Sequence, residues 1–273
     1  MIRLAVRCAP EYAEAVMANL LELAPNGLEE ERGPGWIEYA IYGPPGEVPD
    51  LGEIQAAAGG SLVDVTTTSV PDDWADRWAD FHRPIEVSGR IGVRPSWWDP
   101  KDGLIDVVVD PGRAFGTGGH PTTRLSLELL IELEQAGEAS GPIADWGTGS
   151  AVLAISAAKL GWSPVTACDR EPASLEAAQA NAAVNGVELT IERVDVRESL
   201  PPVAPTVVAN LTANLLADCA RHLEGAAEIP RTLVCSGMLE TEADGVAEAF
   251  SAAGLAESER RGNGEWAALL LRV

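Results

Sequence analysis

The chain has 273 residues, 46% of them hydrophobic, and a formal net charge of −23 at pH 7. This composition is typical of a globular protein, and the charge disfavours binding to nucleic acid or anionic membranes, because phosphate contacts need Lys and Arg. No apolar run approaches the roughly 20 residues of a membrane span, and the N-terminal segment lacks the features of a signal peptide. We therefore expect a cytoplasmic, monomeric protein whose charge would attract a basic protein partner.

The cysteines and histidines are scattered along the sequence. No C-x-x-C motif occurs, and the cysteines are Cys8, Cys168, Cys219 and Cys235. The histidines, His82, His120 and His222, form no cluster either. This spacing predicts neither disulfides nor a bound metal.

Residues 1–70 are expected to form a small α+β domain. The apolar spacing predicts the order strand, helix, strand, strand, helix, strand over residues 2–8, 10–23, 27–33, 36–43, 48–59 and 61–70. That order is typical of the ferredoxin-like fold. The segment has no glycine-rich phosphate loop and no group of catalytic residue types, so we interpret it as a substrate-recognition domain.

Residues 71–84 are expected to link this domain to residues 85–273. Trp74, Trp78 and Phe81 fall on one face of a predicted helix within the linker. The aromatic face suits an interdomain connector or a binding surface. It suits equally well a helix that simply packs against its neighbour.

After residue 84, strands and helices alternate. Strands are predicted within residues 85–98, 104–110, 142–146, 164–169, 189–195, 205–210, 231–237, 255–261 and 265–273. Helices are predicted over residues 123–137, 151–161, 172–186, 211–223 and 239–254. Repeated β-α units imply an α/β domain with a mostly parallel, Rossmann-like sheet and helices on both faces. A ligand of such a sheet binds at the carboxyl ends of the strands.

The segment IADWGTGSAVLAIS, residues 143–156, carries the central signal. Asp145 ends a predicted strand, Gly147 and Gly149 make a sharp turn into a helix, and Ala151 provides a small side chain for close packing. Such a turn lets a ligand approach the backbone and the free N–H groups of a helix start. An ordinary tight turn between strand and helix would show the same pattern.

Two polar residues extend this signal to a nucleoside site. Asp169 ends the next strand, about 20 residues beyond the glycines, where a carboxylate can accept hydrogen bonds from ribose hydroxyls. Asn210 closes a later strand at the same edge of the sheet. Taken alone, either residue could instead cap the helix that follows it. Asp145 is expected near the middle of the ligand, where an anion disfavours phosphate and suits a cation, so S-adenosylmethionine is favoured over a dinucleotide.

The stretch DPGRAFGTGGHPTT, residues 110–123, contains too much glycine and proline for regular helix or strand. It is similar to the signature DPGxAFGTGTHPTT of the PrmA family of ribosomal protein L11 methyltransferases. DWGTGSAVLAI likewise resembles the DFGCGSGILAI of that family, and VVANLTANLL its VVANILAxxL. The stretches DDWADRWADFHRPIEV, PSWWD, SGMLETEADGVAEAF and GEWAALLLRV also fit. The resemblance implies a class I methyltransferase domain with a seven-stranded sheet.

The resemblance also implies particular site residues. Contacts with S-adenosyl-L-methionine are implied for Thr123, Gly147, Asp169 and Asn210. Asp145 and Gly149 are expected to join them, because they belong to the predicted strand end and glycine turn. A loop containing Phe115, Gly116, Thr117 and His120 is implied to close over the methionine end of the cofactor. Asn210 and His120 are the candidate catalytic residues, although His120 could instead make only a structural hydrogen bond within the loop.

The chain departs from the family pattern at four positions. Gly119 replaces a Thr, Trp146 a Phe, Thr148 a Cys and Ala151 the third Gly. Gly119 lies within the signature and bears on substrate placement. At position 151 a small side chain is expected to suffice for helix packing.

The sequence thus predicts a protein N-methyltransferase that acts on lysine or N-terminal amines of ribosomal protein L11. Two alternatives remain open. The same chemistry could act on another protein lysine, a small molecule or a nucleic-acid base, although the lack of a basic patch weighs against nucleic acid. The chain could also be a non-catalytic module that binds the cofactor.

Overall fold

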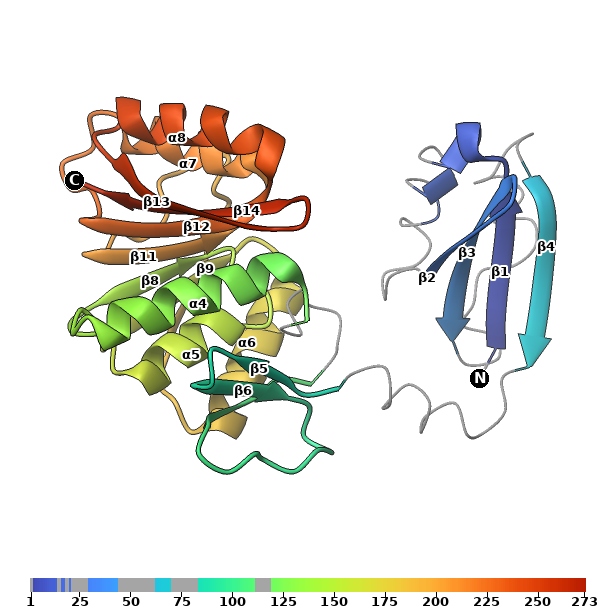
Figure 1. Cartoon of the computed structure of the whole chain (residues 1–273), viewed down its shortest axis with the longest axis horizontal. Helices are drawn as coiled ribbons and strands as arrows, with labels where there is room; N and C mark the ends of the chain where they lie inside the picture. The colour runs from blue at the N-terminus through green and yellow to red at the C-terminus, as the bar shows by residue number, and fades with distance from the viewer. Residues whose placement is uncertain are drawn as a thin grey trace. The chain divides into compact units, whose positions relative to one another are not determined.

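The computed structural model describes residues 2–13, 16–17, 20, 29–43, 62–69, 83–110 and 119–273. The chain divides into two compact units, Met1–Phe81 and His82–Val273. Figure 1 shows both, with the first in blue and cyan and the second running from green to red.

The first unit contains a four-stranded antiparallel sheet in the order β2-β3-β1-β4. The strands are β1 (Ile2–Cys8), β2 (Glu29–Gly33), β3 (Trp36–Gly43) and β4 (Leu62–Ser69). Their positions confirm the four predicted strands, and a short 3-10 turn, η1 (Pro10–Tyr12), follows β1. The predicted helix over residues 48–59 lies outside the described residues, as do half of residues 10–23 and most of the linker. The ferredoxin-like domain therefore stays a prediction.

The core of this sheet follows a two-residue period. Leu4 and Val6 of β1 and Tyr39 and Ile41 of β3 pack together on one face. On β1, the flanking arginines Arg3 and Arg7 point to the other face, and both bond the buried carboxylate of Glu38, at 2.6 and 2.5 Å. Alternate side chains of a strand point to opposite faces, which explains this segregation.

The second unit is built on a seven-stranded sheet in the order β10-β9-β8-β11-β12-β14-β13. The strands are β8 (Ile143–Trp146), β9 (Val165–Asp169), β10 (Thr190–Arg193), β11 (Thr206–Asn210), β12 (Thr232–Leu239), β13 (Ala256–Asn263) and β14 (Trp266–Arg272). The first five strands in this order pair in parallel, and β14 runs antiparallel to β12 and β13. The predicted Rossmann-like sheet is confirmed. The strand order reverses between β8 and β11, and such a switch point is where these sheets bind ligands.

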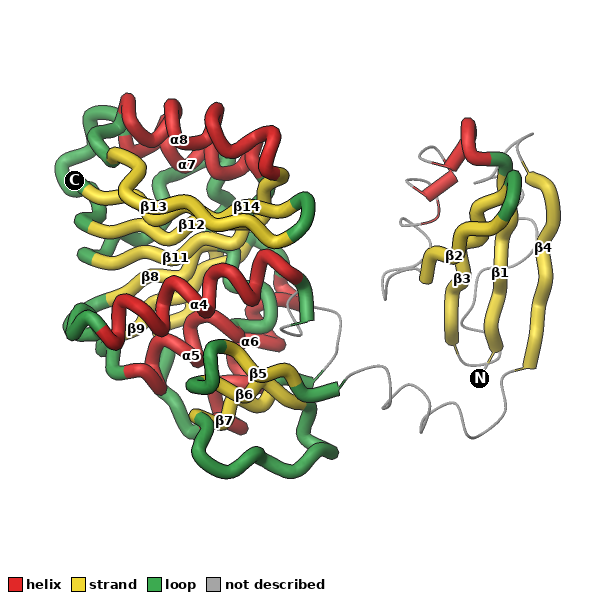
Figure 2. The backbone as a smooth tube through the Cα atoms, viewed as in Figure 1, coloured by secondary structure: helices red, strands yellow, loops and turns green. Residues whose placement is uncertain are grey.

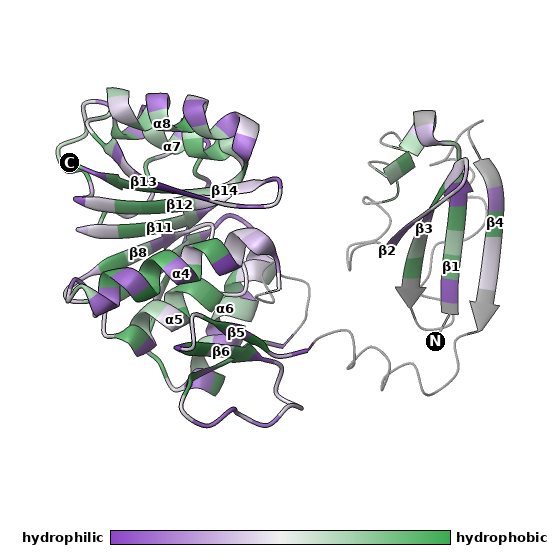
Figure 3. Ribbon diagram, viewed as in Figure 1, coloured by the Kyte–Doolittle hydropathy of each residue, from purple (hydrophilic) through white to green (hydrophobic). Residues whose placement is uncertain are grey.

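Helices cover both faces of this sheet (Figures 1 and 2). One face carries α4 (Pro121–Gln135), α5 (Val152–Leu160) and α6 (Pro172–Asn185), and the other carries α7 (Ala213–Leu223) and α8 (Ala243–Ala252), which follows the 3-10 turn η3 (Glu240–Glu242). The central strands are rich in apolar residues, which are green in Figure 3. On β11, Val208 packs toward α4 and α5, whereas Val207 and Ala209 pack toward α7 and α8. This double burial is typical of parallel sheets.

The strands predicted within residues 85–110 are present, but they form a separate sheet that the sequence analysis did not distinguish. It contains β5 (Ile85–Val87), β6 (Ile91–Arg94) and β7 (Ile105–Val108), with β5 antiparallel and β7 parallel to β6. Its apolar face joins the core of α4 and α5. Among the described helices, none is both long and apolar enough to cross a bilayer.

Candidate functional site

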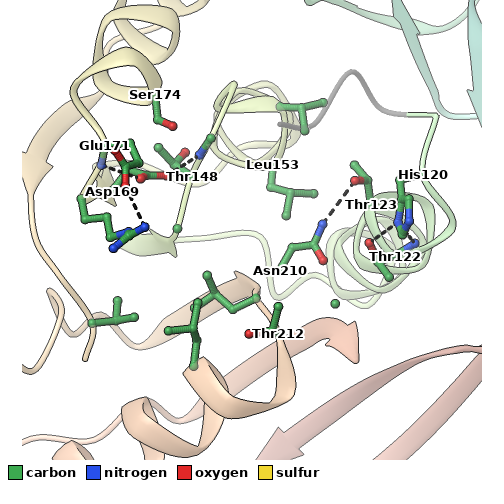
Figure 4. Close-up of a pocket in the computed structure, with 18 of the residues that line it drawn as sticks. His120, Thr122, Thr123, Thr148, Leu153, Asp169, Glu171, Ser174, Asn210 and Thr212 are labelled. Atoms are coloured by element: carbon green, nitrogen blue, oxygen red, sulfur yellow. Dashed lines mark hydrogen bonds and ion pairs between the residues drawn. The ribbon is translucent and has the colours of Figure 1, made fainter. Parts of the chain in front are cut away.

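A cavity of about 460 Å³ lies at the carboxyl ends of the parallel strands. Its wall is formed by the turns after β8, β9, β10 and β11 and by the first turn of α4 (Figure 4). The volume falls within the range of small-molecule sites. The residues used below that line it are His120, Thr122, Thr123, Gly147, Thr148, Gly149, Asp169, Arg170, Glu171, Asp195, Asn210, Leu211, Thr212, Gly237 and Trp266.

The turn after β8 requires left-handed backbone at alternate positions. Gly147 has φ 70° and Gly149 φ 53°. A Cβ on Gly147 would lie 2.2 Å from Leu211 Cδ2, so glycine is needed for space as well as for conformation. The N–H groups of Gly147 and Thr148 both donate to Cys168 O at 2.9 Å, which fixes the turn against β9.

Ala151 continues this pattern with a side chain. It is fully buried and has φ 64°, in the region that disfavours residues with a Cβ. From the sequence, a small residue was expected here for helix packing alone. The backbone shows a second reason, because the family's glycine would adopt this conformation without strain.

Asp145 lies behind the turn and does not line the cavity. Its carboxyl group is 1% exposed, and its Oδ2 accepts hydrogen bonds from Thr148 Oγ1 at 2.6 Å and Ala154 N at 3.1 Å. Its Oδ1 is buried without a hydrogen-bond partner among the described residues. Burial raises the pKa of Asp145 to about 7. The direct ligand contact expected from the sequence does not fit this position, and Asp145 instead braces the turn.

Asp169 joins the ends of β8 and β9 and faces the cavity. Its Oδ2 accepts from Gly149 N at 3.0 Å, and its Oδ1 accepts from Glu171 N at 3.0 Å. The N-cap of α6 is Glu171, so Asp169 does not hold the capping position that was the alternative. An ionised carboxylate has about four acceptor sites, so both oxygens can still accept from a ligand.

Asn210 and Thr123 meet across the cavity wall. Asn210 Nδ2 donates to Thr123 Oγ1 at 3.2 Å, which joins the end of β11 to the first turn of α4 (Figure 4). This orientation leaves Asn210 Oδ1 as an acceptor. The N-cap of α7 is Thr212, so Asn210 is not the helix cap that the sequence left open.

His120 is the N-cap of α4, and it also lines the cavity. Its Nδ1 lies 2.8 Å from Thr122 Oγ1 and accepts from Thr122 N at 3.4 Å. The ring packs edge-on against Trp266, with centroids 4.7 Å apart. Partial burial lowers the pKa of His120. The structural hydrogen bond that the sequence allowed for is therefore present.

Phe115, Gly116 and Thr117 lie outside the described residues, so their part in the site stays a prediction. The described backbone on either side is fixed by side chains. Ser96 N donates to Asp110 Oδ1 at 2.6 Å before this segment, and His120 caps α4 after it.

Several lining residues were missed by the sequence analysis. Asp195 lies just beyond the carboxyl end of β10, much as Asp169 ends β9. Because ligands of such sheets bind at the carboxyl ends of the strands, Asp195 could have been predicted in the same way as Asp169. Trp266, at the start of β14, gave no local signal. Gly237 also gave none, yet its φ is 92° and a Cβ there would lie 2.4 Å from Leu211 O.

Two of the residues that differ from the family pattern make side-chain hydrogen bonds in the structure. Trp146 is buried and donates from its indole N–H to Pro202 O at 2.8 Å. Thr148 supplies the hydroxyl that bonds Asp145. Nothing in the structure explains Gly119, where an added Cβ would have no neighbour within 4 Å among the described residues.

The cavity lining is acidic. It includes the carboxylates of Asp169, Glu171 and Asp195, and Arg170 is the single Lys or Arg among the described lining residues. Arg170 itself pairs with Glu171 at 2.8 Å. Hydrogen bonds from Arg197 hold the pKa of Asp195 well below its usual range. A phosphate group would find no cluster of cations in the described lining, whereas a phosphate-free cation fits these carboxylates.

Comparisons with known proteins agree on one family. A family model described as ribosomal protein L11 methyltransferase (PrmA) matches residues 52–273. A relative of that name from Pelotomaculum thermopropionicum is 39% identical over 212 residues, which cover 76% of this chain and 68% of the relative. The relative from Vibrio cholerae serotype O1 is 41% identical over 182 residues, covering 65% of this chain and 60% of the relative. The chain thus spans about two thirds or less of the length of these curated relatives.

A solved structure shares the fold. The crystal structure of a ribosomal protein L11 methylase from Lactobacillus delbrueckii subsp. bulgaricus has a TM-score of 0.62 to this chain at 29% sequence identity. The match covers 70% of this chain and 98% of the other.

Proposed function

Because the chain belongs to the PrmA family of ribosomal protein L11 methyltransferases, we propose that it methylates amino groups of ribosomal protein L11 with S-adenosylmethionine. The observation that carries the proposal is the acidic cavity at the β8/β11 switch point, with Asp169 bonded to the glycine turn. The acceptors are the N-terminal amine, lysine side chains, or both.

The residues present fit this cofactor. When bound, it supplies an electrophilic methyl group on a sulfonium, and it carries no phosphate. Asp169 would accept from the ribose hydroxyls while keeping its bond to Gly149 N. Its neighbour Asp145 braces the turn from behind through its bonds to Thr148 and Ala154. The carboxylates that line the cavity, Asp169, Glu171 and Asp195, favour a cationic ligand.

Asn210 and His120 have different roles in this proposal. The Thr123 bond fixes the Asn210 amide, and the free Oδ1 would accept from the attacking amine and orient it. Capping through Nδ1 requires that nitrogen to be unprotonated, so the proton of a neutral His120 sits on Nε2. His120 therefore orients groups in the cavity wall and is a poor general base in this state.

The chain's main task is alignment, because in-line transfer to nitrogen needs no metal and no covalent enzyme intermediate. The amine must be neutral to attack. At pH 7 deprotonation costs about 4.6 kcal/mol for a lysine of ordinary pKa and about 1.4 kcal/mol for an α-amine. The N-terminal amine is thus the easier acceptor, and a lysine needs a desolvating environment.

Substrate capture is assigned to residues 1–70, joined to the methyltransferase domain by residues 71–84. This assignment is part of the proposal and is supported by the separate compact unit that contains the four-stranded sheet. A chain with a formal net charge of −23 attracts a basic protein over long range. Attraction of this kind raises the rate of encounter and does not replace alignment at the cavity.

The test is a transfer assay with labelled S-adenosylmethionine. The protein is incubated with unmethylated L11, with a mixture of other ribosomal proteins and with ribosomal RNA, and mass spectrometry locates the label. Label on amino groups of L11 supports the proposal. Label confined to RNA, to other proteins or to a small molecule would contradict the acceptor, and failure to bind the cofactor would contradict the reaction itself.

A further inference from the structure

Two asparagines on α6 contact the glycine turn and strand β7. Asn181 Nδ2 donates to Ser150 O at 2.9 Å, and Ser150 follows Gly149 in the turn after β8. One helical turn later, Asn185 donates from Nδ2 to Val108 O at 2.7 Å and accepts from Val108 N at 2.9 Å. Neither asparagine lines the cavity. Both can therefore influence it only through the backbone of other residues.

The Asn185 side chain is held in a single orientation by its bonds. Besides the two bonds to Val108, its Nδ2 donates to Asn181 O at 2.8 Å. Its oxygen and both of its amide hydrogens are thus engaged. Strand β6 pairs with one edge of β7, where Val109 N donates to Arg94 O at 2.9 Å. On the other edge, the Asn185 amide bonds both the N–H and the C=O of Val108, as a further strand would.

A second side chain covers the same edge of β7. Lys159 of α5 donates to Asp106 O at 2.5 Å, and the Asp106 carboxylate bonds Arg94 at 2.7 and 2.8 Å. The outer edge of β7 is therefore tied to α5 and α6, the helices that follow the glycine turn and Asp169. An edge strand that is bonded in this way keeps a fixed position relative to both.

The turn itself needs support from outside. Gly147, Gly149 and Ala151 all have positive φ, and Ala151 holds this conformation with a Cβ. Ser150 lies between Gly149 and Ala151, and the N–H of Gly149 donates to Asp169. A single hydrogen bond to the Ser150 carbonyl can therefore fix the turn.

We propose that Asn181 and Asn185 are positioning residues for S-adenosylmethionine, because they hold the glycine turn in register with the edge of β7. The proposal rests on the proposed function and adds residues that do not touch the ligand. Asn181 acts directly on the turn. Asn185 acts by anchoring α6 to Val108, so that Asn181 stays aligned with Ser150.

The experiment compares Asn181→Ala and Asn185→Ala with Gln179→Ala, a matched amide truncation at an exposed position of the same helix. Calorimetry gives the Kd for S-adenosylmethionine and for S-adenosylhomocysteine. We expect each asparagine variant to raise both Kd values about tenfold, the scale of one hydrogen bond, and Gln179→Ala to leave them within twofold. In turnover, the KM for S-adenosylmethionine should rise while kcat at saturation stays within threefold.

Conservative variants separate positioning from folding. Asn181→Gln keeps the N–H donor and should recover most of the affinity, whereas Asn181→Asp keeps the shape but not the donor and should not. If an alanine variant fails to fold, the comparison of Asn181→Gln with Asn181→Asp tests whether the N–H donor of residue 181 is needed for cofactor affinity. Unchanged Kd values in the asparagine variants, an equal loss in Gln179→Ala, or a fall in kcat at constant KM would each overturn the proposal.

The outcome is independent of the acceptor. If the protein binds the cofactor but does not label L11, the proposed acceptor fails while the Kd comparison still decides the role of the asparagines. If L11 is labelled normally and the Kd values do not change, only the positioning proposal fails.

Discussion

Gly149 N donates to Asp169 Oδ2 at 3.0 Å, so the glycine turn and the carboxylate expected to hold the ribose form one unit. The carboxyl ends of the neighbouring parallel strands β8 and β9 lie at the same edge of the sheet, which brings these two residues together. The same carboxylate also fixes Glu171 N, at the start of α6. Its position is therefore set before any ligand arrives.

Asp169→Ala should weaken binding of S-adenosylmethionine by about 1–3 kcal/mol, the cost of leaving polar partners unpaired. The loss combines the ribose contact with the support of Gly149 N. Calorimetry measures it, and Glu176→Ala, at an exposed position of α6, is the control. Equal affinity for wild type and Asp169→Ala would remove Asp169 from the ribose site.

Thr123→Val should reduce kcat about tenfold, because misalignment by a fraction of an ångström is costly in transfer reactions. The substitution keeps the shape of the side chain but removes the oxygen that accepts from Asn210 Nδ2. Thr123→Ser keeps that oxygen and should retain most of the activity. The two variants are compared by initial rates at saturating cofactor, and equal rates would show that the Asn210–Thr123 bond does not align the reactants.

The ligand-free protein should lose stability as pH rises from about 4 to 7, through the contribution of Asp145. The folded state raises the pKa of Asp145 from 3.8 to about 7 by burial, so between these values it binds a proton that the unfolded state lacks. The contribution is fully present below pH 3.8 and is lost as pH rises through 7. Asp145→Asn, which cannot ionise, should flatten this part of the profile.

Denaturant titrations at pH 5.5 and pH 8 test this dependence. The difference in free energy of unfolding between the two pH values should be smaller in Asp145→Asn than in wild type. An identical difference in both proteins would mean that Asp145 is ionised throughout this range.

Gly237→Ala should destabilise the protein far more than Gly225→Ala. Both glycines have positive φ, 92° and 73°, so both substitutions carry a strain of about 1 kcal/mol. At Gly237 the Cβ would meet backbone, with Leu211 O at 2.4 Å, whereas no described atom lies within 4 Å of a Cβ at Gly225. Overpacking adds about 1–3 kcal/mol, and denaturant titration of both variants should resolve it; equal losses would contradict the close approach.

A variant lacking residues 1–81 should bind S-adenosylmethionine with the Kd of the starting protein but fail to methylate L11. The described residues that line the cavity all belong to the second unit. Calorimetry and the transfer assay give the two readouts. Methylation of L11 at the original rate by the truncated protein would exclude residues 1–70 from substrate recognition.

The secondary structure of the methyltransferase domain followed from the sequence because its signals are local. Apolar runs marked the buried strands, and helices were marked by the spacing of apolar residues and by Gly and Pro at their ends. Asp169 and Asn210 could be placed at one edge of the sheet because parallel strands end on the same side. The family resemblance added Thr123 and His120.

The tertiary structure alone decided how distant segments approach one another. The burial of Asp145, the contact of Gly237 with Leu211, and the bonds of Asn181 and Asn185 all join residues from separate elements. The separation of β5–β7 into their own sheet is also of this kind, since a strand's local pattern does not encode its partner. The sequence by itself determined the elements and the chemistry at their ends. Packing between remote parts of the chain determined which of those groups face the cavity and which support it from behind.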